Sequence, residues 1–150
     1  FTKDNNTTNR VIMDDETFNG ETVEIPVTTL DEEAPKDKNM ILKIDVEGFE
    51  ANVLKGATKT LSSGNVQAII IELNDSGSAY GHSDQSIHET IISHGFKPVS
   101  YDPIKRLISN LNSYNSDGNN TIYVRDVESI QKRVKDAPKY TIKPSGNFQI

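Results

Sequence analysis

Two acidic residues stand at the ends of apolar runs, where the side chains of a buried strand reach solvent. Asp45 closes the run that begins at Met40, and Glu72 closes the run that begins at Val66. If these runs are neighbouring parallel strands, the two carboxylates lie roughly 5–10 Å apart at one edge of a sheet. Ligands of open α/β sheets bind at that edge. A carboxylate there could orient a substrate hydroxyl, act as its general base or hold a metal ion.

Two further residues extend this set of candidates. Glu47 follows Asp45 closely, and His82 lies in the loop after Glu72, from which it could reach the same rim as a base. The acids also have structural explanations. Asp45 could cap the following helix, Glu47 could interact with the helix dipole, and both strand ends could be solvated acids. The catalytic candidates are therefore Asp45, Glu47, Glu72 and His82, while cofactor-binding residues stay unassigned and no metal ligand is assigned.

The spacing of apolar residues predicts the elements that position these side chains. Residues 40–46 and 66–73 are nearly continuous apolar runs, which is typical of strands buried on both faces. Between them, apolar residues at helical spacing predict a helix over residues 47–63 that ends at Gly64. A strand, a helix and a strand with short connections form the βαβ unit of a parallel sheet.

Other elements flank this unit on both sides. Before it, alternation over residues 23–28 predicts a half-buried strand, which Pro26 restricts to an edge. After it, Ser86 and Glu89 have the spacing of a capping box and predict a second helix. Three more segments follow: strands over residues 96–101 and 120–125, and a polar helix over residues 127–135. We predict an α/β fold whose sheet is parallel at its centre, with the two final strands forming an antiparallel pair at one edge.

The composition of this 150-residue chain is that of one globular domain. We divide it into a polar segment over residues 1–21, an α/β domain over residues 22–126, and a helix and tail over residues 127–150. The net charge of -6 argues against a nucleic-acid or anionic-membrane partner. No apolar run approaches the roughly 20 residues that span a bilayer, and no signal peptide is visible, so we expect a cytoplasmic protein. The absence of cysteine excludes thiol nucleophiles.

The segment around Asp45 resembles the signature of a known enzyme family. Residues 42–50 read LKIDVEGFE, and residues 53–57 read VLKGA. Together they are similar to the signature strand and helix of the FkbM-family methyltransferases. The resemblance implies a class I methyltransferase fold, which is Rossmann-like, and S-adenosylmethionine as the cofactor. It also implies that the acceptor is a hydroxyl group of a sugar or another small molecule.

The resemblance covers the carboxyl-terminal part of that family's domain. Family members carry a glycine-rich cofactor loop upstream of the signature, whereas here only Gly20 precedes Gly48. A partial class I sheet would leave one strand with an open edge. The chain could form a homodimer through that edge.

Two other functions fit the same residues. Asp45, Glu47 and Glu72 could hold Mg²⁺ for phosphoester hydrolysis, since carboxylates at strand ends suit that ion. The chain could also be a non-catalytic interaction module whose open sheet edge binds a partner. The methyltransferase is the leading prediction, because the residue pattern from Asp45 to Glu50 is fairly specific to that family.

Overall fold

The computed structural model of the chain describes residues 9–13, 16–118, 120–142 and 148–149. The main strands are β1 (Met40–Ile44), β2 (Val66–Glu72), β3 (Lys97–Asp102), β4 (Leu107–Asn110) and β5 (Asn120–Val124). The helices are α1 (Leu30–Glu33), α2 (Glu50–Lys55), α3 (Thr58–Ser62), the 3-10 helix η1 (Ser76–Tyr80), α4 (Asp84–Ser93) and α5 (Val127–Asp136). A small separate sheet pairs β6 (Thr141–Ile142) with β7 (Phe148–Gln149).

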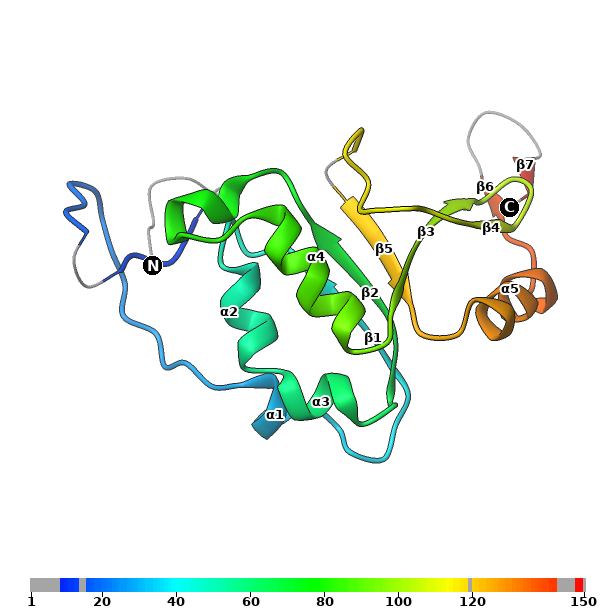
Figure 1. Cartoon of the computed structure of the whole chain (residues 1–150), viewed down its shortest axis with the longest axis horizontal. Coiled ribbons are helices and arrows are strands. Elements are labelled where there is room, and N and C mark those ends of the chain that lie inside the picture. The colour runs from blue at the N-terminus through cyan, green and yellow to red at the C-terminus, as the bar shows by residue number, and fades with distance from the viewer. Residues whose placement is uncertain (1–8, 14–15, 119, 143–147, 150) are drawn as a thin grey trace.

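The five main strands form one sheet in the order β1, β2, β5, β3, β4 (Figure 1). β1 and β2 are parallel, and the other neighbouring strands are antiparallel. The predicted α/β class, with parallel strands followed by antiparallel final strands, is therefore confirmed. The parallel pair lies at one end of this sheet, so β1 is an edge strand.

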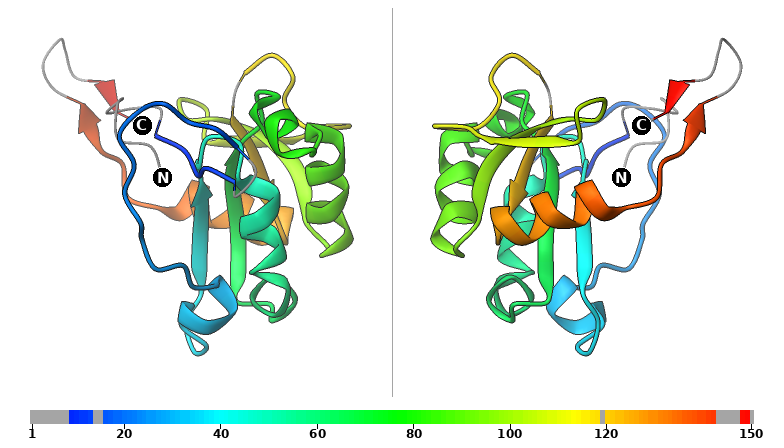
Figure 2. Two further views of the ribbon diagram at one scale, coloured as in Figure 1. Left: turned by 90° about the vertical axis from the view of Figure 1, so that its left-hand side faces the viewer. Right: turned by 90° about the vertical axis from the view of Figure 1, so that its right-hand side faces the viewer.

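Helices cover the two faces of the sheet unequally (Figure 2). The face under α2, α3 and α4 carries the main core, which includes Ile44, Leu54, Leu61, Ile69, Ile71, Ile87, Ile91 and Tyr123. On the opposite face, Ala68, Val99 and Val124 pack against Val127 and Ile130 at α5. This second cluster does not extend to β1, where the side chain of Ile41 is 64% exposed.

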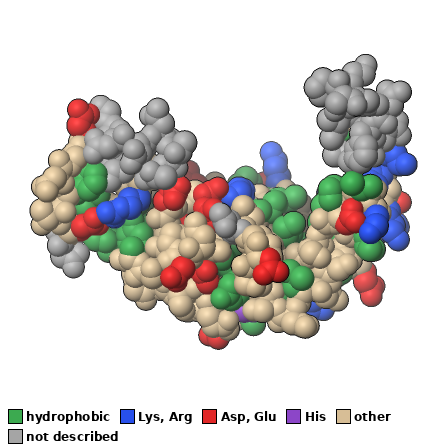
Figure 3. All heavy atoms as spheres, turned by 90° about the horizontal axis from the view of Figure 1, so that it is seen from above, with side chains coloured by type: hydrophobic (Ala, Val, Ile, Leu, Met, Phe, Trp, Pro, Cys, Tyr) green, Lys and Arg blue, Asp and Glu red, His purple; other side chains and the backbone are tan. Residues whose placement is uncertain are grey.

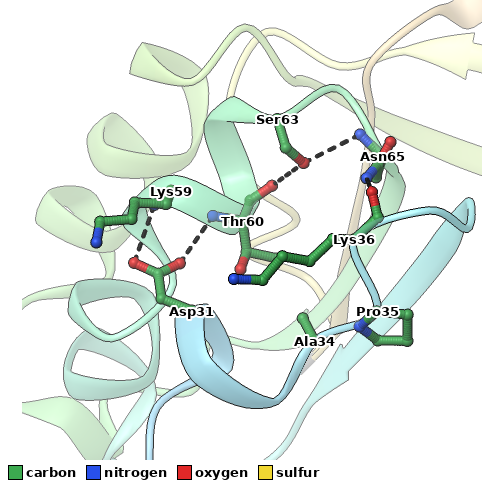
Figure 4. A pocket seen from close by; sticks show the side chains of 8 residues that line it. All are labelled: Asp31, Ala34, Pro35, Lys36, Lys59, Thr60, Ser63 and Asn65. Atoms are coloured by element: carbon green, nitrogen blue, oxygen red, sulfur yellow. Dashed lines mark hydrogen bonds between the residues drawn. The ribbon is translucent and has the colours of Figure 1, made fainter.

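The predicted helix over residues 47–63 forms as two helices, α2 and α3, which meet at Gly56. Asp31 explains the break. Its carboxylate accepts hydrogen bonds from the backbone N–H groups of Lys59 at 3.0 Å and Thr60 at 2.7 Å, so it caps α3 (Figure 4). The N–H of Asp31 in turn donates to the carbonyl of Gly56 at 3.0 Å. A distant residue therefore ends one helix and begins the next.

Two other local predictions are wrong. Residues 23–28 form no strand, and the side chain of Val27 is 84% exposed, because no strand in the described part of the chain pairs with this segment. The second helix, α4, begins at Asp84 rather than after Ser86. Ser83 is its N-cap and exchanges hydrogen bonds of 3.2 Å with Ser86, so the capping box lies earlier than predicted.

The predicted antiparallel pair and the last helix are present as β3, β5 and α5. The pair is not at the edge, however, because β5 lies between β2 and β3. The edge is occupied by β4, a strand that comes from the turn-rich stretch between the two predicted strands. Within the described ranges, no helix has the length and apolar character needed to cross a membrane.

Candidate functional site

The carboxyl ends of β1 and β2 bring the two predicted acids together. The parallel register pairs Ile44 with Ile71, so the next residues along the two strands, Asp45 and Glu72, are neighbours, and their side chains interact. The Nζ atom of Lys43 lies 2.8 Å from Oδ2 of Asp45. In Figure 3, which views this end of the parallel strands, acidic side chains lie beside a basic one near the middle of the surface. The predicted juxtaposition is therefore present.

The environment pushes the pKa values of these two carboxyl groups in opposite directions. The hydrogen bond from Lys43 lowers the pKa of Asp45. Partial burial raises the pKa of Glu72, and the neighbouring acids Asp45 and Glu47 raise it further. Two adjacent carboxyls behave as one unit in which one group ionises first and the other holds its proton longer. Here Asp45 is the group that ionises first, and Glu72 is the stronger base of the two.

The turn after β1 holds Glu47 beside this pair. Glu47 has a φ of 54° and Gly48 a φ of 97°, so the chain reverses sharply there. The buried carboxylate of Glu50 accepts the N–H groups of Val46 at 3.3 Å and Gly48 at 3.1 Å. Glu50 is therefore a structural residue that fixes the turn. Glu50 is not among the candidates named from the sequence, although an acid just after Glu47-Gly48 can reach back to those N–H groups.

Asp45 does not cap the helix that follows it. α2 begins at Glu50, and its N-cap residue, Phe49, makes no side-chain capping hydrogen bond. The N–H of Gly48, which such a cap could bind, is held by Glu50 instead. The side chain of Asp45 is 48% exposed and is therefore accessible to a ligand.

His82 lies in the short connection between η1 and α4. It lines a groove of about 330 Å³ between α2 and α4, together with Ala51, Leu54, Ser86 and Ile87. The chain reaches this position because η1 turns it away from the end of β2 and onto the helical layer. The predicted approach of His82 to the rim of the acids stays a prediction.

A second cavity, of about 160 Å³, lies between α1 and α3 (Figure 4). Two of its polar side chains make structural hydrogen bonds: Asp31 caps α3, and the side-chain amide of Asn65 donates to the carbonyl of Lys36 at 2.8 Å. Asp31 and Asn65 are therefore residues of the framework of the fold. Among the residues that the structure describes, no three or more His, Asp or Glu side chains form a group suited to a metal ion.

A mixed α/β sheet with a parallel pair, antiparallel remaining strands and carboxylates at the ends of the parallel strands is consistent with part of a class I methyltransferase fold. A family model of the methyltransferase FkbM domain matches residues 2–98, which include Asp45, Glu47, Glu72 and His82. The chain therefore belongs to the FkbM methyltransferase family. Comparisons with curated proteins and with solved structures found no match.

Membership of this family implies S-adenosylmethionine as the methyl donor. Gly48 is the glycine at the strand ends that could let a ligand approach the backbone. A Cβ atom on Gly48 would lie 2.6 Å from the carbonyl oxygen of Ser76 and 2.8 Å from the ring of Tyr80, so the chain itself fills that space. The described residues around the strand ends thus provide carboxylates, but no glycine-lined cradle for the donor.

Proposed function

We propose that this chain provides the acceptor side of an O-methyltransferase, and that Asp45 and Glu72 bind a hydroxyl group of a sugar or another small molecule. The observation that carries the proposal is the pair of interacting carboxyl groups at the ends of adjacent parallel strands. Lys43 and Asp45 are each about half exposed, which leaves one side of the pair open to a substrate.

The two carboxyl groups would have different roles. Asp45, held ionised by Lys43, would accept a hydrogen bond from the substrate and orient it. Glu72 would take the proton from the hydroxyl oxygen that becomes methylated, because a carboxylate with a raised pKa is a stronger base. A polyhydroxylated acceptor suits this arrangement, since neighbouring hydroxyl groups could bind both carboxyls at once.

Glu47 supports this pair through its negative charge, which raises the pKa of Glu72. His82 has no role in the proposal, because it lines the groove between α2 and α4. The magnesium-dependent hydrolase stays an alternative without a supporting metal-binding group in the described part of the chain.

The test is methyl transfer from S-adenosylmethionine carrying a labelled methyl group to a panel of sugars and small hydroxyl compounds. We expect Glu72→Gln to lower the transfer rate by roughly 100-fold or more, because the amide cannot accept the proton. Asp45→Asn should mainly weaken acceptor binding and raise KM. The matched control is Glu128→Gln in the first turn of α5, which should leave the rate unchanged.

Two results would contradict the proposal. One is a Glu72→Gln variant that transfers methyl groups at the wild-type rate. The other is a wild-type chain that binds S-adenosylmethionine but methylates none of the hydroxyl compounds in the panel.

A further inference from the structure

The candidate carboxyl pair has a third neighbour in the sheet. β5 lies next to β2 on the side away from β1 (Figure 1), and its antiparallel register places Asn120 directly opposite Glu72. The parallel register of β1 and β2 sets Asp45 beside Glu72 on the other side. Asp45, Glu72 and Asn120 therefore form a row across three neighbouring strands, with Glu72 in the middle.

The two carboxyl groups of this row point to the face of the sheet that carries α5. Side chains alternate between the two faces along a strand. Ile44 and Ile71, which immediately precede Asp45 and Glu72, belong to the main core under α2, α3 and α4. Asp45 and Glu72 therefore lie on the opposite face, which agrees with the interaction between their side chains.

Asn120 points to the same face as the carboxyl groups. The residue that follows it, Thr121, is fully buried and lies opposite Ile71 of the main core. Opposite residues of an antiparallel pair share a face, so Thr121 points toward the helices and Asn120 points away from them. The Cβ atoms of such opposite residues are about 4.5–5.5 Å apart, so Asn120 and Glu72 are within reach of one small molecule.

The backbone at Asn120 is fixed by the loop that precedes β5. The side-chain amide of Asn115 donates to the carbonyl of Asn120 at 3.2 Å. The backbone N–H of Asn115 donates to Oγ1 of Thr121 at 3.0 Å. The hydrogen bond that Asn120 accepts from Asn115 uses its backbone carbonyl, and Asn120 itself is exposed. Its side-chain amide is therefore accessible to a ligand at a position that the loop and β2 define.

An amide beside two acids widens the chemistry of the row. An ionised carboxylate only accepts hydrogen bonds, whereas the side chain of asparagine both donates and accepts them. A hydroxyl group bound at Glu72 has Asp45 on one side and Asn120 on the other. Because neighbouring strands are only about 4.8 Å apart, one small molecule can contact all three side chains. A molecule with hydroxyl groups on three consecutive carbons would fill the row, with its middle hydroxyl at Glu72.

We propose that Asn120 is a specificity-determining residue that binds the hydroxyl group next to the one that is methylated, and that the acceptor carries hydroxyl groups on three consecutive carbons. The inference rests on the proposed function, because it takes Glu72 as the residue that receives the reacting hydroxyl. It adds that the middle hydroxyl of the three is the one methylated. A sugar without one outer hydroxyl leaves a polar side chain of the row without a partner and binds more weakly.

The test is an NMR titration of the whole chain with methyl xylopyranoside, an uncharged sugar whose three hydroxyl groups lie on consecutive carbons. The titration needs no methyl donor. We expect the side-chain amide signal of Asn120 and the carboxyl signal of Glu72 to shift with the same dissociation constant. Asn120→Ala should raise this constant about three- to tenfold, which is the loss expected for one hydrogen bond. Because Asn120 is exposed, the change leaves the chain folded.

Two controls isolate the contribution of Asn120. Asn110→Ala removes an exposed asparagine from β4, which β3 separates from β5, and should leave the dissociation constant unchanged. The second control uses the two deoxy analogues of the sugar, each of which lacks one outer hydroxyl. The analogue that lacks the partner of Asn120 should bind the wild-type chain more weakly than the parent sugar does. It should bind Asn120→Ala as tightly as it binds the wild-type chain.

Two outcomes would overturn the inference and leave the proposed function intact. In the first, the sugar shifts the carboxyl signal of Glu72 but not the amide signal of Asn120. In the second, Asn120→Ala binds the sugar as tightly as the wild-type chain does. A sugar that shifts neither signal up to its solubility limit would contradict both the inference and the binding of a hydroxyl acceptor at the carboxyl pair. The role of Glu72 as the base is tested separately, by methyl transfer in Glu72→Gln.

Discussion

Gly48→Ala is expected to destabilise the chain by about 3–5 kcal/mol. The φ of 97° at this position strains any residue with a Cβ atom, at a cost of about 1–3 kcal/mol. The added methyl group would also collide with the carbonyl oxygen of Ser76 at 2.6 Å, and overpacking of this kind costs about 1–3 kcal/mol. Because Gly48 lies in the turn that carries Glu47, the variant should also lose the geometry of the carboxyl pair.

Gly64→Ala separates the cost of backbone strain from the cost of the steric collision. Gly64 has a φ of 81°, but nothing lies within 4 Å of the position of its Cβ, so the backbone strain is the main cost. Urea denaturation followed by circular dichroism would give both free energies of unfolding. Gly48→Ala should be the less stable variant by at least about 1 kcal/mol. Equal stabilities would show that the contact with Ser76 does not constrain the turn.

The second large loss of stability is expected on replacement of Arg125. Its guanidinium group donates to three backbone carbonyls: those of Val66 at 3.1 Å, His94 at 2.9 Å and Leu61 at 2.5 Å. It also lies 4.3 Å from the centre of the Phe96 ring. One side chain therefore joins the start of β2 to the carboxyl ends of α3 and α4.

We expect Arg125→Ala to lower the free energy of unfolding by about 3 kcal/mol or more, because three partly buried carbonyls lose their partner together with a cation–π contact. Arg125→Lys should recover only part of this, since an ammonium group cannot bind three carbonyls in the fixed geometry of a guanidinium. Arg133→Ala, on the exposed surface of α5, is the control and should change stability by less than about 0.5 kcal/mol. If Arg125→Ala were as mild as this control, the three hydrogen bonds would contribute nothing to stability.

The parts of the fold that were predicted correctly depend on local patterns. The apolar runs of β1 and β2 and the helical spacing between them lie within short windows, so their order and direction could be inferred from the residues themselves. Contacts between distant residues were not predictable in this way. The break between α2 and α3 depends on Asp31, which lies 28 residues before Lys59, and no local signal marks it.

Dependence on distant partners also explains why the predicted strand over residues 23–28 does not form. The alternation of apolar and polar residues over residues 23–28 is typical of a strand that is buried on one face. It does not indicate whether a neighbouring strand is available for pairing. Arg125 is a similar case, because its partners lie 31 to 64 residues away along the chain.

For the site, the parallel register made the contact between Asp45 and Glu72 predictable. The opposite directions of their pKa shifts were not, because they depend on the hydrogen bond from Lys43 and on the partial burial of Glu72. His82 was expected near the acids on the basis of sequence proximity alone. The structure shows that His82 lines the groove between α2 and α4, which sequence proximity did not predict.

The most direct test of the carboxyl pair is a carbon-13 NMR titration of the side-chain carboxyls of Asp45 and Glu72. We predict that Glu72 titrates above the ordinary value of 4.5 and Asp45 below 3.8. In Asp45→Asn, the pKa of Glu72 should fall part of the way back, because burial remains while the negative neighbour is removed. Ordinary pKa values for both residues, with Glu72 unchanged by Asp45→Asn, would contradict the assignment of these acids to one site.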